Sequence, residues 1–181
     1  AEVQAEFTLI PAPAAHAIAL RCRELAIDAA FLEEMRIGRE ASGHSMQGMI
    51  RAVQSRLTPA DAQWVYAGAT VQDVTDTWMM LVLRTARQQI ERDLERVDQA
   101  MAVLALRYRD TPMAGRTHGQ QGLPITFGFK VAGWLAEVRR HRQRFVEIAQ
   151  RMDVVQLAGG VGSLSSLGPH ALELQRSFAQ R

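Results

Sequence analysis

The chain has 181 residues, of which 48% are apolar and 22% charged, and its net charge at neutral pH is +2. This balance is typical of a globular protein with a buried core, and the abundance of Ala, Leu, Gln, Arg and Glu favours helix. The small charge and the scarcity of aromatic residues argue against a nucleic-acid surface. No apolar run approaches the roughly 20 residues that span a bilayer, so we expect no membrane segment.

The cysteine and histidine content bears on cofactors and on the cellular compartment. Cys22 is the single cysteine, which excludes an internal disulfide and fits a reducing cytoplasm. No Cys/His cluster has the spacing of a zinc site. We therefore expect a cytoplasmic protein without a bound metal.

The first part of the chain has the pattern of short helices. Pro13 lies near the first turn of a helix expected over 14–25, and a second helix is expected over 29–35. The polar stretch Gly38–Gly48 is expected to be a loop. The pair Thr58-Pro59 predicts an N-cap followed by proline at the first helical position.

Two long apolar stripes with three- and four-residue spacing follow. The first predicts a helix of roughly 30 residues from Val74, ended by Thr111-Pro112, and the second predicts a helix over 127–155. The stripes consist of Met79, Leu83, Ala86, Ile90, Leu94, Val97, Met101, Leu104 and Tyr108, and of Phe127, Val131, Trp134, Val138, His141, Phe145, Ile148, Met152 and Val155. Paired long helices of this kind indicate a helical bundle.

The predicted fold is therefore all-α. We expect a small N-terminal helical domain over 1–73 and the first part of a central long-helix bundle over 74–181. No helix stop signal precedes Arg181, so we expect the chain to be an N-terminal fragment of a longer protein.

The connection 110–126 is too long and too polar for a simple helix turn and predicts a functional loop. His118 stands in it between Thr117 and Gly119, next to Arg116, with Gln120 close behind. Histidine suits proton donation to a leaving group because its ordinary pKa lies near neutrality. Arg116 would supply charge for an anionic substrate. The alternative is a histidine that only closes the loop by hydrogen bonding.

Two further polar segments carry candidates. His44 would line a binding site or merely pin its own loop. Thr70, Gln72 and Asp73 would contact an anion or cap the first long helix, and these two roles are compatible because a helix N-terminus attracts anions.

The segment GRTHGQQGLPITFGFKVAGWL, residues 115–135, resembles the second signature region of the fumarase/aspartase superfamily. The likeness is to adenylosuccinate lyases and bacterial 3-carboxy-cis,cis-muconate cycloisomerases in particular. The stretch 68–77, GATVQDVTDT, resembles the first signature region, and 42–44 resembles the upstream histidine loop. The tract 156–164, QLAGGVGSL, is similar to the glycine-rich stretch of the family and favours the cycloisomerase branch.

The resemblance implies an all-helical subunit that forms a homotetramer with active sites shared between subunits. It implies His118 as general acid with Thr117 beside it, Thr70 on a substrate carboxylate and His44 in the pocket. The remaining residues expected to bind substrate are Gln72, Arg116, Gln120, Lys130 and Ser163. The general base of the family is a serine in a Ser-Ser-x-x-Pro-x-Lys-x-Asn loop, and this full pattern does not occur in these residues.

The implied reaction is acid–base addition or elimination beside a carboxylate of a small di- or tricarboxylate, without a metal or organic cofactor. It most resembles the lactonising cycloisomerase reaction. Tyr66 and Val71 stand where adenylosuccinate lyases carry histidine and serine, which weakens that alternative. Another fumarate-releasing C–N or C–O lyase, and a non-catalytic scaffold or pseudoenzyme, are the other hypotheses.

Overall fold

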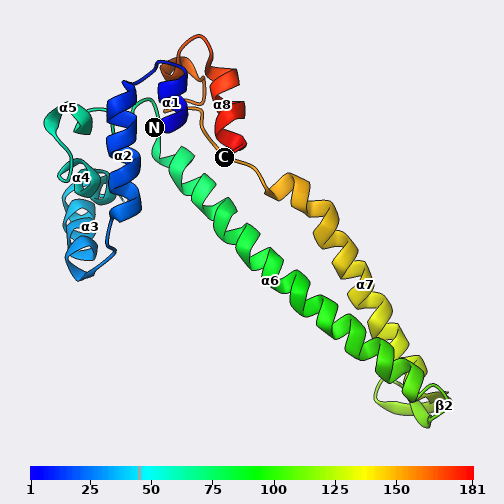
Figure 1. The fold of residues 1–181 in the computed structure, drawn as a ribbon. Coiled ribbons are helices and arrows are strands. Elements are labelled where there is room, and N and C mark those ends of the chain that lie inside the picture. Colours follow the sequence, from blue (N-terminus) through cyan, green and yellow to red (C-terminus); the bar gives the residue numbers. More distant parts are fainter. Residues whose placement is uncertain (45) are drawn as a thin grey trace. The chain divides into compact units, whose positions relative to one another are not determined.

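The structure is a computed structural model that describes residues 1–44 and 46–181, and it is built mainly of helices (Figure 1). The predicted all-α class is confirmed, with one small sheet added to it. The chain divides into two compact units, Ala1–Trp78 with Val155–Arg181, and Met79–Val154. The division into domains 1–73 and 74–181 stays a prediction. Within the described residues, no helix combines the length and apolar character needed to cross a membrane.

The first unit is made of short helices and the beginning of a long one. Its elements are α1 (Glu2–Glu6), α2 (Ala12–Glu24), α3 (Ala29–Ser42), α4 (Gln47–Gln54), α5 (Pro59–Ala62), the first residues of α6 (Val71–Arg107), the 3-10 turn η1 (Ser165–Leu167) and α8 (Ala171–Ala179). The predicted start of α5 is confirmed, because the Thr58 hydroxyl accepts a hydrogen bond from the Asp61 amide and Pro59 occupies the first turn.

Helices α3 and α4 pack against each other through two glycines. A methyl group built on the buried Gly38 would lie 2.3 Å from Cα of Gly48, so the two backbones are in direct contact. The expected loop over Gly38–Gly48 is therefore wrong at both ends, because the first residues belong to α3 and α4 begins at Gln47. Helix α3 continues through Ser42 and ends at Gly43, whose φ of 69° suits a helix end. Ser45, in the same predicted loop, lies outside the described residues.

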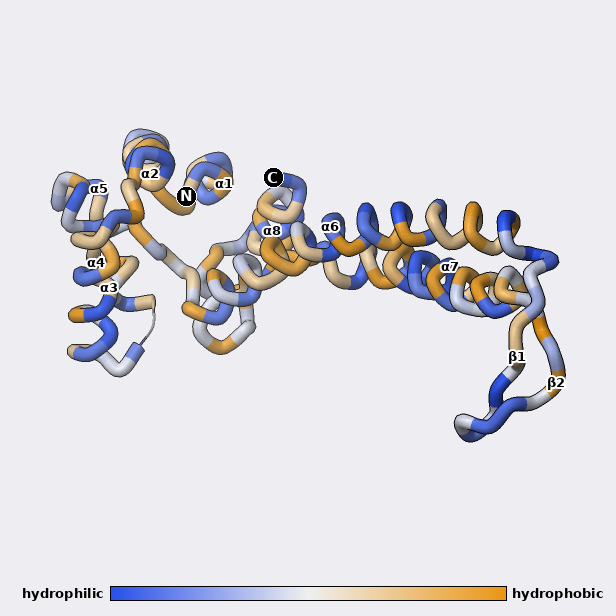
Figure 2. Tube along the Cα trace, turned by 90° about the horizontal axis from the view of Figure 1, so that it is seen from below, coloured by the Kyte–Doolittle hydropathy of each residue, from blue (hydrophilic) through white to orange (hydrophobic). Residues whose placement is uncertain are grey.

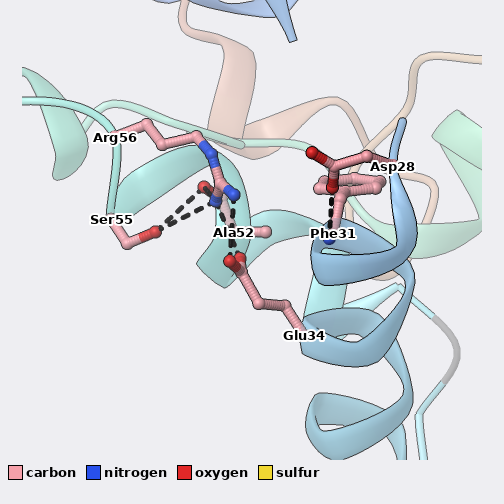
Figure 3. A network of polar contacts seen from close by, with 6 residues as sticks. All are labelled: Asp28, Phe31, Glu34, Ala52, Ser55 and Arg56. Atoms are coloured by element: carbon pink, nitrogen blue, oxygen red, sulfur yellow. Dashed lines mark hydrogen bonds and ion pairs between the residues drawn. The ribbon is translucent and has the colours of Figure 1, made fainter. Parts of the chain in front are cut away.

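Arg56 fastens α4 to the N-terminal half of α3 (Figure 3). Its Nη1 and Nη2 donate to the Glu34 carboxylate at 2.7 and 2.9 Å, and Nη1 also donates to the carbonyl of Ala52. The guanidinium lies 5.9 Å from the centre of the Phe31 ring, and Asp28 caps α3 by accepting from the Phe31 amide. This bidentate pair holds the pKa of Glu34 below its ordinary value.

One core cluster of the first unit lies where α1, α8, η1 and the segment before η1 meet. It is formed by the buried side chains of Val3, Leu157, Leu167, Ala171 and Leu174. Ala171 and Leu174 are three residues apart on one face of α8, and Leu174 is completely buried. The residues that follow the second long helix are thereby packed against the N-terminal helix.

In the second unit, α6 and α7 (Phe127–Met152) run antiparallel side by side (Figures 1 and 2). The 37-residue α6 is longer than predicted, and α7 ends three residues early. Ion pairs join the two helices: Arg87 bridges Glu91 and Asp153, and the buried Asp98 accepts from Arg139 at 3.0 Å. Charged side chains therefore occupy part of the seam between the helices.

Only some of the side chains in the predicted apolar stripe of α6 are even partly buried within this chain. Leu83, Leu94 and Met101 are partly buried, while Ile90 and Val97 remain 44% and 39% exposed. On α7, Trp134 is also exposed, and so is His141, which belongs to the second predicted stripe. The apolar residues that stay exposed need another surface to cover them.

The connection predicted as a long loop over 110–126 is a β-hairpin instead. Strand β1 (Pro112–Thr117) pairs antiparallel with β2 (Gln120–Thr126), and the register shifts between Ala114 and Arg116. That irregularity interrupts the alternation from which a strand is predicted. Hydrogen bonds from the amides of residues 127 and 128 to the carbonyls of residues 111 and 108 hold the base of the hairpin to the end of α6.

Candidate active site

The hairpin carries the first group of predicted site residues at its tip. Thr117 pairs with Gln120, and the two residues between them, His118 and Gly119, have φ of 47° and 74°. Two positive φ values in a two-residue loop are the geometry of a type I′ turn. A side chain other than glycine costs about 1–2 kcal/mol in this conformation. His118 is therefore held at the tip against its own backbone preference, as is common for residues of functional sites.

The side chains at the tip are open to solvent. Arg116, Thr117, His118 and Gln120 are all exposed. Figure 2 shows the hairpin beyond the ends of α6 and α7, with a hydrophilic tip. Within one exposed turn, the structure thus brings together an imidazole, a hydroxyl, an amide and a guanidinium, which are the donors that a carboxylate substrate needs.

Lys130, the only lysine of the chain, lies in the first turns of α7. Thr126 caps that helix by accepting a hydrogen bond from the Phe129 amide at 3.1 Å. The exposed Lys130 ammonium lies 5.1 Å from the ring centre of Trp134, which steadies it by a cation–π contact. Strand β2 runs directly into α7, so Lys130 and the hairpin tip belong to one continuous segment.

Thr70, Gln72 and Ser163 lie in the other compact unit. The Thr70 amide donates to the Asp73 carboxylate at 2.9 Å, and the Gln72 amide group donates to Asp76 at 2.6 Å. Ser163 is exposed in the loop before η1, where its hydroxyl lies 2.9 Å from that of Ser165. Both functions foreseen for Thr70 remain compatible, because it precedes the N-terminus of α6.

His44 lies just beyond the end of α3 and is exposed. Its amide donates to the Ser42 hydroxyl at 3.2 Å, and its Nδ1 accepts from the Met46 amide at 3.3 Å. These bonds stabilise the loop, which agrees with the hypothesis that His44 pins its own loop. Among the described residues, the hydrogen bond of the imidazole is made through Nδ1.

Tyr66, which stands where adenylosuccinate lyases carry histidine by resemblance, has an unusual backbone. Its φ is 69°, which lies in the left-handed region. Partial burial raises the pKa of Tyr66 above its ordinary value, and the Asp73 charge adds to the rise, whereas the Thr70 hydrogen bond opposes it.

Sequence reasoning placed Asp73 in a segment that either contacts an anion or caps the first long helix, and it missed the wider contacts of the side chain. The side chain is 3% exposed and also accepts hydrogen bonds from the amides of Ala158 and Gly159, at 2.8 and 3.0 Å. The Thr-x-x-Asp spacing is a capping signal. The contacts with Ala158 and Gly159 cannot be recognised from the local sequence, because these residues lie more than 80 positions further along the chain.

The nine predicted residues thus fall into two groups. Arg116, Thr117, His118, Gln120 and Lys130 lie in the second unit, and His44, Thr70, Gln72 and Ser163 lie in the first. An open groove of about 580 Å³ in the second unit is lined by residues such as Arg92, Arg139 and Val146, and by none of the predicted site residues. Among the residues described, no group of three or more His, Cys, Asp or Glu side chains is arranged to hold a metal ion.

Comparison with known proteins gives a consistent picture. The sequence profile of a family described as lyase matches residues 1–181. The N-acetyl-S-(2-succino)cysteine lyase of Enterococcus italicus is 40% identical over 97% of this chain and 38% of its own length. The 3-carboxy-cis,cis-muconate cycloisomerase of Pseudomonas aeruginosa is 36% identical over 99% of this chain and 39% of its own length.

The same likeness holds in three dimensions. The crystal structure of a fumarate lyase from Mesorhizobium sp. BNC1 superimposes with a TM-score of 0.91 at 38% identity. It matches 99% of this chain and 41% of that one. The chain spans about two fifths of the length of the relatives that it matches.

Proposed function

The chain belongs to the lyase family of the fumarase/aspartase superfamily, and on that basis we propose that its protein catalyses acid–base elimination or addition beside a carboxylate. The substrate is a small di- or tricarboxylate. His118 donates the proton to the departing group in the elimination, and in the addition it takes that proton back from the group that adds. The observation that carries this proposal is the exposed type I′ turn that presents His118 between Thr117 and Gln120.

The chemistry explains why these residue types are needed. Removal of a proton beside a carboxylate produces a carbanion whose charge spreads onto that carboxylate. Donors and positive charge that are already in place stabilise it. Thr117, Arg116 and Lys130 supply them on the hairpin side, and the N-terminus of α6 with Thr70 supplies them in the other unit. Gln72, Gln120, Ser163 and Nε2 of His44 complete the proposed contacts with substrate.

Tetrameric assembly is part of the proposal. Large apolar side chains remain exposed along both long helices; they include Trp78, Leu81, Ile90, Val97, Leu106, Trp134 and Val146. The tip that carries His118 is exposed as well. Burial of the apolar faces between subunits would cover them, and the walls around His118 would come from neighbouring subunits, so that each active site is shared.

Two reaction types are the leading candidates for the finer function. Lactonising cycloisomerisation, as in the Pseudomonas relative, was favoured by the glycine-rich tract. Fumarate release from a succinylated thioether is favoured by the 40% identity to the Enterococcus lyase. Adenylosuccinate cleavage ranks lower, because Tyr66 and Val71 replace the residues expected for it.

A substrate panel tests the proposal. The natural full-length protein is incubated with N-acetyl-S-(2-succino)cysteine, 3-carboxy-cis,cis-muconate and adenylosuccinate, and fumarate or lactone formation is followed. Turnover of one of these supports the proposal and identifies the branch. A pseudoenzyme would turn over none of them and would show no thermal stabilisation by any dicarboxylate, since only a ligand that binds the folded state raises the melting temperature.

A further inference from the structure

Asp73 is the most buried charged side chain in the first unit, and it connects two segments far apart in the sequence. One carboxylate oxygen accepts from the amides of Thr70 and Gly159, at 2.9 and 3.0 Å, and the other accepts from the Ala158 amide at 2.8 Å. All three donors are backbone groups of the same compact unit. The single side chain therefore joins the start of α6 to the glycine-rich loop that contains Ser163.

The next turn of α6 strengthens this connection. Thr77 follows Asp73 by four residues and so lies on the same face of the helix. Its hydroxyl donates to the Gln156 carbonyl and accepts from the Gln156 amide, both at 3.0 Å. Residues 156–159 are thus held along the first two turns of α6.

The far side of the same loop is also fastened. The Ser166 hydroxyl donates to the carbonyl of Gly68 at 2.7 Å, just before Thr70. Ser163 therefore lies between two attachment points, at residues 159 and 166, and both bind the segment 68–73. The position of Ser163 relative to Thr70 is set by these contacts.

A carboxylate is the only side chain of this size that satisfies all three amides. Hydrogen bonds from backbone amides to an ionised acceptor are the stronger kind, and the positive end of the α6 dipole favours the negative charge. In an asparagine at this position, one oxygen would become an NH₂ group. Whichever way the amide were turned, at least one of the three N–H donors would then face another donor.

We propose that Asp73 is a positioning residue: it holds the Ser163 loop against the Thr70 segment so that both bind the same substrate molecule. The inference rests on the proposed function, because it assigns Thr70 and Ser163 to substrate. Asp73 itself is buried and takes no part in the proton transfer.

The test compares Asp73→Asn with Asp93→Asn in the full-length protein. Asp93 lies on the same helix, is exposed and contacts only side chains there among its described partners, Gln89 and Arg96. Asp73→Asn is expected to raise KM and to lower kcat/KM on the order of 100-fold, because a misplacement of about 1 Å has that effect. Asp93→Asn is expected to leave both unchanged.

Two readouts separate positioning from a general loss of stability. A merely structural role would reduce the amount of active enzyme and leave the KM of the remaining enzyme unchanged. In Asp73→Asn, the rate of hydrogen exchange is expected to rise by about tenfold at the amides that lose their acceptor, which is the effect of losing one hydrogen bond. These are the Ala158 amide, or the amides of Gly159 and Thr70, depending on which way the asparagine side chain is turned. Unchanged KM together with unchanged exchange would overturn the inference.

The same experiment distinguishes this inference from the proposed function. If the wild-type protein turns over no substrate of the panel, the proposed function fails. In that case hydrogen exchange alone tests whether Asp73 holds the loop in place. Faster exchange at these amides in Asp73→Asn supports the inference, and unchanged exchange overturns it.

Discussion

Gly38 and Gly48 bring two helices into backbone contact, since a methyl group on Gly38 would lie 2.3 Å from Cα of Gly48. No side chain fits in that space. The contact fixes how α3 and α4 pack, and the end of α3 carries His44 into its loop. A glycine pair therefore determines where one of the proposed site residues lies.

Gly38→Ala is expected to destabilise the protein by about 1–3 kcal/mol, the usual cost of overpacking a tight contact. Gly133→Ala is the matched control, because Gly133 lies inside α7 with open space where its Cβ would be. Alanine there is expected to stabilise by about 1 kcal/mol through helix propensity. Chemical denaturation at one fixed protein concentration measures both changes, and equal effects of the two substitutions would contradict the packing account.

Asp98 makes the stability that the ion pairs between α6 and α7 contribute depend on pH. The hydrogen bond from Arg139 holds the pKa of Asp98 below its ordinary value, and Arg142 adds to the effect. A carboxyl whose pKa is lowered on folding stabilises the folded state above its ordinary pKa. That contribution disappears as the pH falls through the lowered value.

Asp98→Asn is therefore expected to lower the melting temperature at pH 7, and the difference from wild type should shrink as the pH falls from about 4 toward 2. The exposed Asp93→Asn is the control and should have little effect at any pH. Melting curves between pH 7 and pH 2 measure the difference. A gap between Asp98→Asn and wild type that stays constant over this range would argue against the ion pair.

The exposed apolar face of α6 predicts how the protein assembles. Ile90 and Val97 are seven residues apart on one side of the helix and are 44% and 39% exposed. The double substitution Ile90→Asp/Val97→Asp is expected to dissociate the proposed tetramer, because an unpaired carboxylate buried at an interface costs on the order of several kcal/mol. Light scattering after gel filtration measures the mass. The exposed polar Gln99 supplies the control, Gln99→Asp, and an intact tetramer in the double variant would contradict the proposed interface.

Thr117 is expected to assist the reaction through its hydroxyl. Thr117→Val keeps the β-branched shape that suits strand β1 and removes only the donor. A hydrogen bond to a charged group is worth about 1.5–3 kcal/mol, so kcat/KM should fall roughly 10- to 100-fold while the melting temperature stays near wild type. Thr85→Val removes a hydroxyl whose hydrogen bond among the described residues goes to the Leu81 carbonyl of α6, and it should leave the kinetics unchanged. Equal kinetics for both variants would remove Thr117 from the site.

Local patterns predicted the parts of this fold that depend on neighbouring residues. The Thr58-Pro59 cap and the two long helices were foreseen, because capping and apolar spacing are properties of short stretches. The hairpin was not, since the shift near Gly115 breaks the alternation of its first strand. Its one local signal was His118-Gly119, a pair able to adopt two positive φ values.

Features that join distant residues escaped sequence reasoning. The contact of Gly38 with Gly48 and the hydrogen bonds of Asp73 to residues 158 and 159 depend on tertiary packing. The ion pairs of the α6–α7 seam were likewise hidden, because the apolar stripe alone suggested which face would be buried. For the site, the residue types at the hairpin were recognisable from the sequence, but their presentation on an exposed turn was not.

The central claim is that His118 is the proton donor, and His118→Asn tests it most directly. Asparagine accepts a positive φ, so the turn and the assembly should be retained. The exposed His16 on α2 provides the control, His16→Asn. In the full-length protein, with a substrate identified by the panel, we expect kcat to fall by about 10²- to 10⁴-fold in His118→Asn and to stay unchanged in His16→Asn. Undiminished turnover by folded, tetrameric His118→Asn would contradict the account.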